Sequence, residues 1–371
     1  MLSLTFVAHE VHRRGGQERA AAEVLTRLAT EVDLTVVARV CELPGVRARF
    51  TRIAVPGRPA VVSSALFARA AAAAARRAGS QLVQSIGAAA IEADLITAQF
   101  CQAAFTARFG GLRGGGAIRS FLQSRVQARF VADERRAYAA SRLRQVIAVS
   151  SGVARELQEH YRVPPGRISV IPNGVDHAVF HPADMTGRRT LRLRLGLPAD
   201  ACLALFLGGD WERKGLRDAI SAVAGLADMQ LVVVGAGNQA PMREHAAQVG
   251  ASGQVRFVGP SAEPERWYQA ADLLLFPSRY EAFSLVTLEA AASGLPIIAH
   301  AINGTEDLIT DGENGCLSEW GAEALRAHLT RLRDDQVLRA RMGAAAAVSA
   351  QRYGWDRIAA EHLAVIRTSV A

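Results

Sequence analysis

The sequence predicts an α/β protein made of two doubly wound, Rossmann-like domains. The chain has 371 residues, of which 50% are hydrophobic, and at one to two hundred residues per domain this is enough for two cores. Short apolar segments alternate with helix-like segments in the first half, and the alternation begins again after a stretch rich in Pro, Gly and Arg at residues 181–198. This order is typical of parallel sheets covered by helices on both faces.

The first predicted domain covers residues 1–180. Residues 2–8 lack a basic leader and a small-residue cleavage site and run into a polar loop, so we interpret them as a first buried strand of the mature sequence. A helix-like segment follows at residues 17–29. The remaining strands of this domain are expected at residues 34–38, 82–85, 94–98, 146–150 and 168–171.

The second predicted domain covers residues 181–350. Residues 351–369 have the period of an amphipathic helix with no strand after it, so we expect the C-terminal helix, 351–371, to pack back on the first domain. Ligands of open parallel sheets collect at the carboxyl ends of the strands, so two such domains facing each other would form a deep cleft between them. The strands of this domain are expected at residues 202–207, 231–234, 255–258, 273–276 and 297–299.

The cysteines and the hydropathy pattern exclude several classes of protein. No stretch reaches the roughly 18 to 20 uninterrupted apolar residues that cross a bilayer. The four cysteines lie far apart without a C-x-x-C pair, which predicts neither a zinc site nor a disulfide framework. We therefore expect a cytoplasmic protein. These cysteines are Cys41, Cys101, Cys202 and Cys316.

Basic residues are concentrated in the first half of the chain. Residues 1–180 carry 24 arginines and 13 acidic residues, whereas residues 181–371 carry 19 basic and 22 acidic residues. Such an excess favours an anionic partner, which could be a membrane surface, an acidic acceptor or a nucleic acid. Aromatic residues make up only 6% and do not interleave with the arginines, so we expect no nucleic-acid partner. The composition predicts no particular oligomeric state.

Nine arginines and two acidic residues lie between residues 105 and 145. Ile118, Leu122, Val126 and Phe130 recur there at four-residue spacing. This pattern fits an interfacial helix on anionic lipid, which would make the protein peripheral on the inner face of the membrane. It fits equally a helix packed on the sheet with a solvated arginine face, and both interpretations remain open.

A pair of glycines stands between the first predicted strand and the first helix. Gly15 and Gly16 follow the polar segment that contains His9 and His12. Glycines at a helix start let backbone N–H groups approach an anion, and the helix dipole adds a favourable field. The alternative is an ordinary tight turn from strand to helix.

A second candidate anion site follows residues 202–207. Lys214 is the only lysine in a chain with 42 arginines, and Arg213 precedes it directly. A planar guanidinium beside a compact ammonium matches a pyrophosphate well. The alternative interpretation is a solvated charged turn.

Two carboxylates provide the sharpest signal in the sequence. Glu281 and Glu289 are eight residues apart, a little over two helical turns, so on one helix both could point into one cleft. Backbone N–H groups of Phe283, Ser284 and Leu285 would lie at the start of that helix, ready for a phosphate. Alternatively the two acids are ordinary helix residues, but Glu289 stands among apolar neighbours, where an unpaired acid is costly.

At this point the C-terminal half resembles the retaining nucleotide-sugar glycosyltransferases of family four, which have the GT-B architecture. The local likeness is to enzymes that build the lipopolysaccharide core or the cell envelope, in which Arg directly precedes Lys. The resemblance covers most of residues 146–320, whereas residues 40–145 match only in general pattern. It is carried by residues 148–151, 171–176, 213–215, 234–237, 257–259, 281–296 and 312–315.

The resemblance implies a role for each matching residue. Arg213 and Lys214 would neutralise the donor diphosphate, and Gly15 and Gly16 would close over the phosphate and the sugar from the other domain. Glu281 would hold sugar hydroxyls. Glu289 would accept hydrogen bonds from the ribose hydroxyls, and the Val258 backbone would meet the base.

The implied reaction is transfer of a hexose, with retention, from a nucleotide-diphosphate sugar to a glycan or glycolipid of the cell envelope, with UDP rather than GDP as the nucleotide. The nucleotide sugar is a substrate, and we expect no cofactor. We also expect no metal, because the chain has neither an Asp-x-Asp motif nor a His and Cys cluster at metal-ligand spacing.

Residues that would contact the acceptor are less defined. Family members often carry a histidine in the first domain, but the matching stretch here offers Gln99, which leaves His9 and His12 as alternatives. Two other functions share this fold, a nucleotide-sugar epimerase and a non-catalytic sugar-nucleotide-binding protein. The carboxylate pair together with Arg213 and Lys214 favours transfer.

Overall fold

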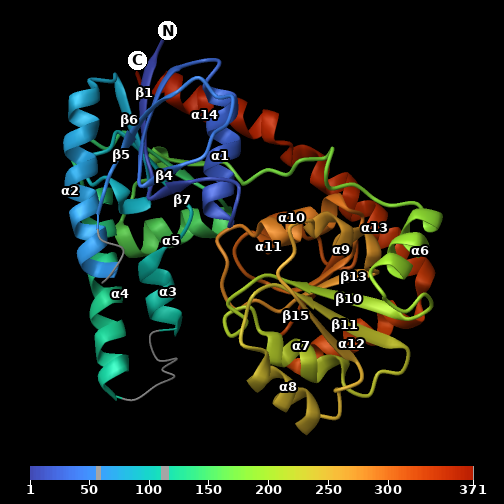
Figure 1. The fold of residues 1–371 in the computed structure, drawn as a ribbon. Helices are drawn as coiled ribbons and strands as arrows, with labels where there is room; N and C mark the ends of the chain where they lie inside the picture. The colour runs from blue at the N-terminus through green and yellow to red at the C-terminus, as the bar shows by residue number, and fades with distance from the viewer. Residues whose placement is uncertain (56–59, 110–116, 371) are drawn as a thin grey trace. The chain divides into compact units, whose positions relative to one another are not determined.

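The chain folds into two compact units, each with a parallel sheet of its own (Figure 1). In this computed structural model residues 1–55, 60–109 and 117–370 are described. One unit combines Met1–Asn173 with Trp355–Ala371, and the other is Gly174–Gly354. The predicted class, α/β with two Rossmann-like domains, is confirmed.

The sheet of the first unit has seven parallel strands in the order β5-β3-β1-β6-β7-β8-β9. β5 was not predicted, because its four residues are all exposed and no apolar run marks them. Strands β2 and β4 form a separate two-stranded parallel pair that is not part of this sheet. The strands are β1 (Ser3–Val7), β2 (Glu10–Val11), β3 (Asp33–Ala38), β4 (Val40–Cys41), β5 (Arg49–Arg52), β6 (Leu82–Ile86), β7 (Leu95–Ala98), β8 (Gln145–Ala148) and β9 (Ile168–Val170).

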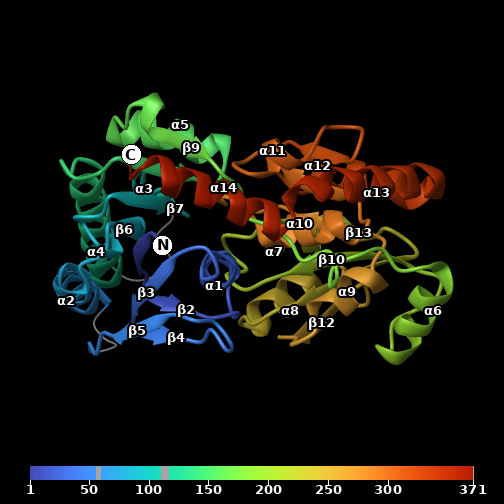
Figure 2. The same ribbon diagram turned by 90° about the horizontal axis from the view of Figure 1, so that it is seen from above.

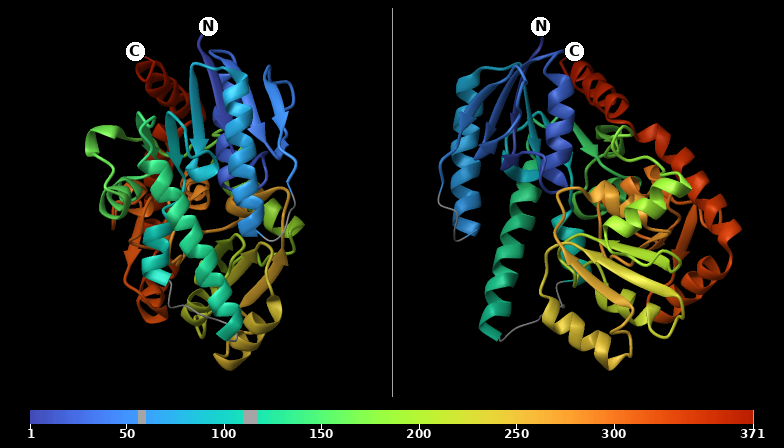
Figure 3. Two further views of the ribbon diagram at one scale, coloured as in Figure 1. Left: turned by 90° about the vertical axis from the view of Figure 1, so that its left-hand side faces the viewer. Right: turned by 45° about the vertical axis from the view of Figure 1, so that its right-hand side comes forward.

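Helices cover both faces of this sheet, with α2 and α4 on one face and α1 and α14 on the other (Figure 2). The C-terminal helix α14, red in Figure 3, lies beside α1, and Arg27 and Asp356 form an ion pair between them. The helices are α1 (Gln17–Leu28), α2 (Ala60–Ala78), η1 (Gly87–Ala89), α3 (Gln102–Phe109), α4 (Ala117–Tyr138), α5 (Ser151–Tyr161), η2 (Pro165–Arg167) and α14 (Trp355–Thr368).

The sheet of the second unit has six parallel strands in the order β12-β11-β10-β13-β14-β15. Phe206 and Phe276, on the two central strands, are fully buried in its core. The sequence predicts five of these strands and misses the edge strand β15. The strands are β10 (Cys202–Leu207), β11 (Met229–Val234), β12 (Val255–Gly259), β13 (Leu273–Phe276), β14 (Ile297–His300) and β15 (Gly315–Ser318).

Helices α7, α8 and α12 lie on one face of this sheet, and α9, α10 and α13 lie on the other (Figure 1). Helix α6 was not predicted, since it lies in the Pro, Gly and Arg-rich stretch, where the Asp184 carboxylate accepts a hydrogen bond from the Gly187 N–H and caps it. The helices are α6 (Met185–Arg194), α7 (Leu216–Val223), α8 (Gln239–Gln248), α9 (Pro264–Ala270), α10 (Leu285–Ala292), α11 (Thr305–Leu308), α12 (Ala322–Asp334), α13 (Gln336–Ala350) and η3 (Gln351–Tyr353).

The chain passes between the units twice. We expected the first passage after residue 180 and the second after residue 350, and the structure has them at Asn173 and at Gly354. The Val175 N–H donates to the Tyr353 carbonyl oxygen at 2.8 Å, and Val175 pairs with Gly354 in a parallel bridge. These contacts join residues 174–180 to the second unit.

The arginine-rich segment forms most of α4. Val126 and Phe130 are half-buried, whereas Ile118 and Leu122 belong to the helical residues 117–123, whose side chains lie outside the described part. The choice between an interfacial helix and a packed helix therefore stays a prediction. Within the described residues, every helix is too short or too polar to span a bilayer.

A buried carboxylate joins three helices of the first unit. Glu134 in α4 accepts hydrogen bonds from the Tyr161 hydroxyl of α5 at 2.6 Å and from the Gln102 N–H at the start of α3 at 2.9 Å. Burial raises the pKa of Glu134 to about 7, although these two hydrogen bonds oppose the shift. Glu156 nearby raises this pKa further.

We therefore expect Glu134→Gln to stabilise the protein in a pH-dependent way. An acid whose pKa is higher in the folded state loses stability as the pH rises from its unfolded pKa near 4.5 to its folded value. The free energy of unfolding of the variant should exceed that of the parent by on the order of 3 kcal/mol at pH 8, and the two should be equal at pH 4.5. Urea midpoints at both pH values test this, with the exposed Glu159→Gln as the control that should match the parent. An equal shift at both pH values would contradict the linkage.

Candidate functional site

Two polar segments meet at the carboxyl edge of the second unit's sheet. β10 ends at Leu207 and leads to Arg213 and Lys214, and β13 ends at Phe276 and leads to Glu281. β10 and β13 are parallel neighbours, so both segments leave the sheet at the same edge. Residues that are far apart in the sequence therefore become neighbours.

One carboxylate oxygen organises the site. Glu281 Oε1 lies 2.8 Å from Arg213 Nη1 and 2.9 Å from Lys214 Nζ. The same oxygen accepts a hydrogen bond from the Ser278 hydroxyl at 3.0 Å. Arg213 also donates to Asp210 Oδ2 at 2.8 Å through its Nε. We name these residues, Asp210, Arg213, Lys214, Ser278 and Glu281, the ion cluster.

The electrostatics of the ion cluster keep Glu281 charged. Burial alone would raise the pKa of Glu281, but the positive charges of Lys214 and Arg213 outweigh burial and lower it. Burial also works against the Arg213 charge, and the attraction of Glu281 overcomes it, so the pKa of Arg213 is raised. The cluster thus presents two cations, the half-buried carboxylate of Glu281 and the exposed carboxylate of Asp210.

Glycines make room for these side chains. Gly208 has φ +123°, and a Cβ added there would lie 2.8 Å from Lys214 Cε. Gly215 has φ +75°, and a Cβ added there would lie 2.2 Å from the Pro277 carbonyl oxygen. Backbone with positive φ is strained for other residues. Gly208 and Gly215 therefore let the two segments approach each other and let Lys214 cross the end of β10.

The expected arrangement of two carboxylates on one helix is wrong. Helix α10 begins at Leu285, with Ser284 as its N-cap residue, so Glu281 lies in the loop before it. The reason is local, because the Ser278 hydroxyl and the two cations hold Glu281 in an irregular segment. Phe283, Ser284 and Leu285 do lie at the helix start.

Glu289 is 3% exposed in the middle of α10. Its Oε2 accepts a hydrogen bond from the hydroxyl of the fully buried Tyr268 in α9 at 2.8 Å. The ring of Tyr268 meets that of Phe180 edge to face, with centroids 5.8 Å apart. Tyr268 was not predicted as a site residue, since an aromatic residue on a helix ordinarily indicates core.

Val258 lies at an irregularity of the edge strand β12. Phe257 pairs with Val233 of β11 and Gly259 pairs with Val234, so the register shifts at Val258. Such an irregularity frees a residue's backbone from regular pairing. Val258 is at the same carboxyl edge of the sheet as the ion cluster.

In the first unit the glycine pair stands where it was expected, before α1. Gly16 is the N-cap residue of α1, and nothing lies within 4 Å of a Cβ added to it. Gly15 has φ +83°. His12 is buried, with Nε2 3.1 Å from Glu10 Oε2. His9 is exposed, and its ring lies 4.4 Å from that of Phe67 at an angle of 38°.

Gln99 makes a reciprocal amide pair with Asn173. Its Nε2 donates to Asn173 Oδ1 at 2.8 Å, and Asn173 Nδ2 donates to Gln99 Oε1 at 3.3 Å. Asn173 is 5% exposed. Asn173 was predicted only as part of the resemblance, and its pairing with Gln99 was not predicted, because it depends on the strand order that brings the segments after β7 and β9 together.

Metal ligation is not indicated by the side chains that the structure describes, among which no three His, Cys, Asp or Glu residues gather closely enough to hold an ion. The four cysteines are free thiols. Expected independence from metals and cofactors stays a prediction.

Comparisons with known proteins agree with this architecture. A family model described as Glycosyltransferase Family 4 matches residues 14–179, and one described as Glycosyl transferases group 1 matches residues 188–348. A D-inositol 3-phosphate glycosyltransferase of Streptomyces bingchenggensis is 39% identical over 250 residues, covering 63% of this chain and 54% of that protein. The chain thus spans about half the length of the curated relatives it matches.

Solved structures with the same fold have lower sequence identity. WaaG, a glycosyltransferase involved in lipopolysaccharide biosynthesis, superposes with a TM-score of 0.82 at 21% identity, covering 98% of this chain and 99% of WaaG. Anabaena HepE in complex with UDP and glucose superposes with a TM-score of 0.75 at 16% identity, covering 99% of this chain and 100% of HepE.

We expect Gly208→Ala to weaken anion binding at the ion cluster. The added methyl group would push the flexible Lys214 side chain away from Glu281, and the affinity for inorganic pyrophosphate should fall roughly tenfold. Calorimetric titration measures this affinity. Gly253→Ala is the matched control, because nothing lies within 4 Å of a Cβ added there. Unchanged affinity in Gly208→Ala would show that Lys214 does not bind the anion from this position.

Proposed function

The chain belongs to the family-four glycosyltransferases, and we propose that it moves a hexose, with retention of configuration, from a nucleotide-diphosphate sugar to an acceptor of the cell envelope. The observation that carries the proposal is the ion cluster, in which two cations share one half-buried carboxylate at the carboxyl edge of a parallel sheet. UDP is the proposed nucleotide. HepE, which shares the fold, has been solved with UDP and with UDP-glucose.

Arg213 and Lys214 are proposed to bind the diphosphate. Each already contacts Glu281, but a guanidinium has five N–H donors and an ammonium has three, so both keep donors for phosphate oxygens. The start of α10, at Phe283, Ser284 and Leu285, would add backbone N–H groups and the positive end of a helix dipole. Gly15 and Gly16 would contribute the same kind of N–H donor from the first unit.

Glu281 and Glu289 are proposed to bind hydroxyl groups on either side of the diphosphate. Glu281 would accept from the transferred sugar, and Glu289 from the ribose. The Tyr268 hydroxyl holds Glu289 through Oε2. The carboxylate would therefore keep its orientation while Oε1 faces the nucleotide. The Val258 backbone, at the register shift of β12, would contact the base.

The proposed chemistry follows from the charge that develops as the bond to the sugar breaks. Positive charge grows on the sugar and negative charge on the departing diphosphate, and preorganised cations stabilise the latter. Retention would come from attack by the acceptor hydroxyl on the side of the leaving group, so no enzymic nucleophile is needed. With Arg213 and Lys214 present, a metal ion is not needed for that charge.

Two classes of acceptor are supported by different relatives. The likeness of fold to WaaG supports a glycan or glycolipid of the cell envelope. The sequence relatives named as D-inositol 3-phosphate glycosyltransferases support a phosphorylated polyol instead, and the basic first half of the chain suits either anion. His9, His12 and Gln99 remain the proposed acceptor contacts.

The central test separates nucleotide binding from transfer. We expect Lys214→Ala to weaken UDP binding by roughly tenfold to a hundredfold and to lower the transfer rate by at least as much, because it removes a charge-assisted donor. Glu281→Gln removes a negative charge beside the diphosphate, so UDP should bind as tightly or tighter while transfer falls by about a hundredfold or more. Calorimetry with UDP and GDP, and release of nucleotide from their sugars, measure the two effects.

Glu244→Gln is the control for this test, since it removes an exposed carboxylate of α8 in the same unit. Its binding and transfer should equal those of the parent. Equal losses of binding and transfer in Glu281→Gln would instead place Glu281 in nucleotide binding. Product NMR in the parent reaction should show the anomeric configuration of the donor.

We also propose that the protein works in the cytoplasm, peripherally on the inner face of the membrane. The support is the arginine-rich helix α4, in which Arg125 and Arg135 are exposed. Each basic residue near an anionic surface contributes about 1 kcal/mol, and this attraction is screened by salt.

At low salt we expect the protein to sediment with vesicles that contain phosphatidylglycerol and to stay in solution with phosphatidylcholine vesicles. The double variant Arg125→Glu and Arg135→Glu should lose most of this binding. The double variant Arg194→Glu and Arg341→Glu changes the net charge equally in the other unit and should retain it. Equal recovery of the parent with neutral and anionic vesicles would exclude membrane binding by this surface.

A further inference from the structure

The second unit has a large cavity at the opposite edge of its sheet from the ion cluster. The cavity has a volume of about 1020 Å³ and is lined by residues at the amino ends of four strands. Cys202 opens β10, and Asp228, Asp272 and Pro296 directly precede β11, β13 and β14. Because β10 is six residues long, the two edges are about 20 Å apart.

One ion pair in this cavity is structural. Asp272 Oδ2 accepts hydrogen bonds from Arg192 Nη2 at 2.6 Å and from the Leu203 N–H at 2.7 Å. The other Arg192 nitrogens donate to carbonyl oxygens, Nε to Ala270 and Nη1 to Ala199. Arg192 and Asp272 therefore satisfy each other and fix α6 against the sheet.

Arg188 has no comparable partner. It lies one helical turn before Arg192 on α6, and its Nη1 is 3.6 Å from Asp272 Oδ1. Its Nε is buried and has no hydrogen-bond acceptor in the part of the chain that the structure describes. A buried donor on a charged group without an acceptor is costly. The arrangement therefore leaves an unmet requirement for an anion or another acceptor beside Arg188.

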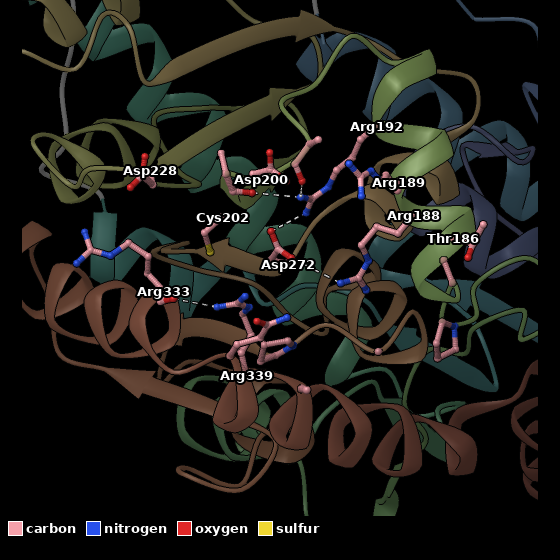
Figure 4. A pocket seen from close by; sticks show the side chains of 18 of the residues that line it. Thr186, Arg188, Arg189, Arg192, Asp200, Cys202, Asp228, Asp272, Arg333 and Arg339 are labelled. Carbon is pink, nitrogen blue, oxygen red and sulfur yellow. Dashed lines mark hydrogen bonds and ion pairs between the residues drawn. The ribbon is translucent and has the colours of Figure 1, made fainter.

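Positive charge exceeds negative charge in the inner part of the cavity. Arg188, Arg192 and Arg339 surround the single carboxylate of Asp272 (Figure 4). Burial lowers the pKa of Arg188, and the charges of Arg192 and Arg339 lower it further, although Asp272 opposes them. Burial and the two neighbouring arginines together thus outweigh the attraction that the Asp272 carboxylate exerts on Arg188.

The remaining charges lie at the rim. Asp334 pairs with Arg333 at 2.7 Å, and Asp200, Asp228 and Arg189 are exposed. Exposed charges are screened by water and salt much more than buried ones. The inner arginines therefore determine which ion the cavity favours.

We propose that this cavity binds a phosphate dianion, either free or as the monoester of a small metabolite, between Arg188 and Arg339. Guanidinium groups bind phosphate oxygens through paired, charge-assisted hydrogen bonds. A bound dianion would give Arg188 Nε an acceptor and would balance the two inner charges that Asp272 leaves unpaired. This site is separate from the ion cluster and does not depend on the proposed transfer reaction.

The test is calorimetric titration of the full chain with inorganic phosphate and with glycerol 3-phosphate. Arg188→Gln and Arg339→Gln should each weaken phosphate binding by roughly tenfold or more. Arg194→Gln is the matched control, because this exposed arginine lies on the same helix but does not line the cavity. Arg213→Gln disables the ion cluster and should leave phosphate binding at the cavity unchanged.

The fold of Arg188→Gln is expected to persist, because Asp272 keeps Arg192. Its melting temperature without phosphate should equal or exceed that of the parent, and added phosphate should raise it less than in the parent. The proposal is overturned if phosphate binds Arg188→Gln as tightly as the parent, or if only Arg213→Gln loses the binding. Binding of glycerol 3-phosphate but not free phosphate would still support the cavity and assign it to a monoester.

Discussion

The geometry of the second unit's carboxyl edge depends on one shared oxygen atom, Glu281 Oε1. Arg213 and Lys214, which follow β10, and the Ser278 hydroxyl, which follows the neighbouring strand β13, all donate to it within 3.0 Å. With only one of these partners, this half-buried carboxylate would not recover the hydration that it has lost. The close approach of Gly215 to the Pro277 carbonyl, and the space beside Gly208, are the backbone conditions under which all the partners reach it.

The balance of positive and negative charge differs between the two edges of the second unit's sheet. At the carboxyl edge the positive charges of Arg213 and Lys214 are balanced by the carboxylates of Glu281 and Asp210. At the amino edge Arg188 and Arg192 both approach the carboxylate of Asp272, Arg339 adds a third positive charge to the cavity, and one Arg188 nitrogen stays without an acceptor in the described structure. The balanced charges of the ion cluster suit a site that must distinguish the bound substrate from the transition state. The excess positive charge at the amino edge suits a site that only binds an anion.

The fold was predictable because buried parallel strands are nearly continuous apolar runs, and those of β10 and β13 are clear in the sequence. β5 could not be predicted in this way because its residues are all exposed. The approximate positions of Arg213, Lys214 and Glu281 after strands followed from the same pattern. Their shared contact with one carboxylate oxygen could not be predicted, because it depends on β10 and β13 being neighbours in the sheet. Local sequence does not encode this strand order. Tyr268 was missed because an aromatic residue on a helix ordinarily indicates core, and its contact to Glu289 joins two helices that are separate in the sequence.

The chain's single lysine can be understood from the space it occupies. Lys214 is 8% exposed, and its ammonium lies 4.6 Å from the centre of the Phe276 ring and 2.9 Å from Glu281 Oε1. Gly208 lines the narrow path of its methylene groups. A planar guanidinium is wider than an ammonium and needs coplanar acceptors, yet Arg213 already approaches the same oxygen at 2.8 Å. Two guanidinium groups would compete for one oxygen in that space, whereas the compact ammonium of Lys214 fits beside the guanidinium of Arg213. The exception in an arginine-rich sequence therefore follows from the crowding around one carboxylate.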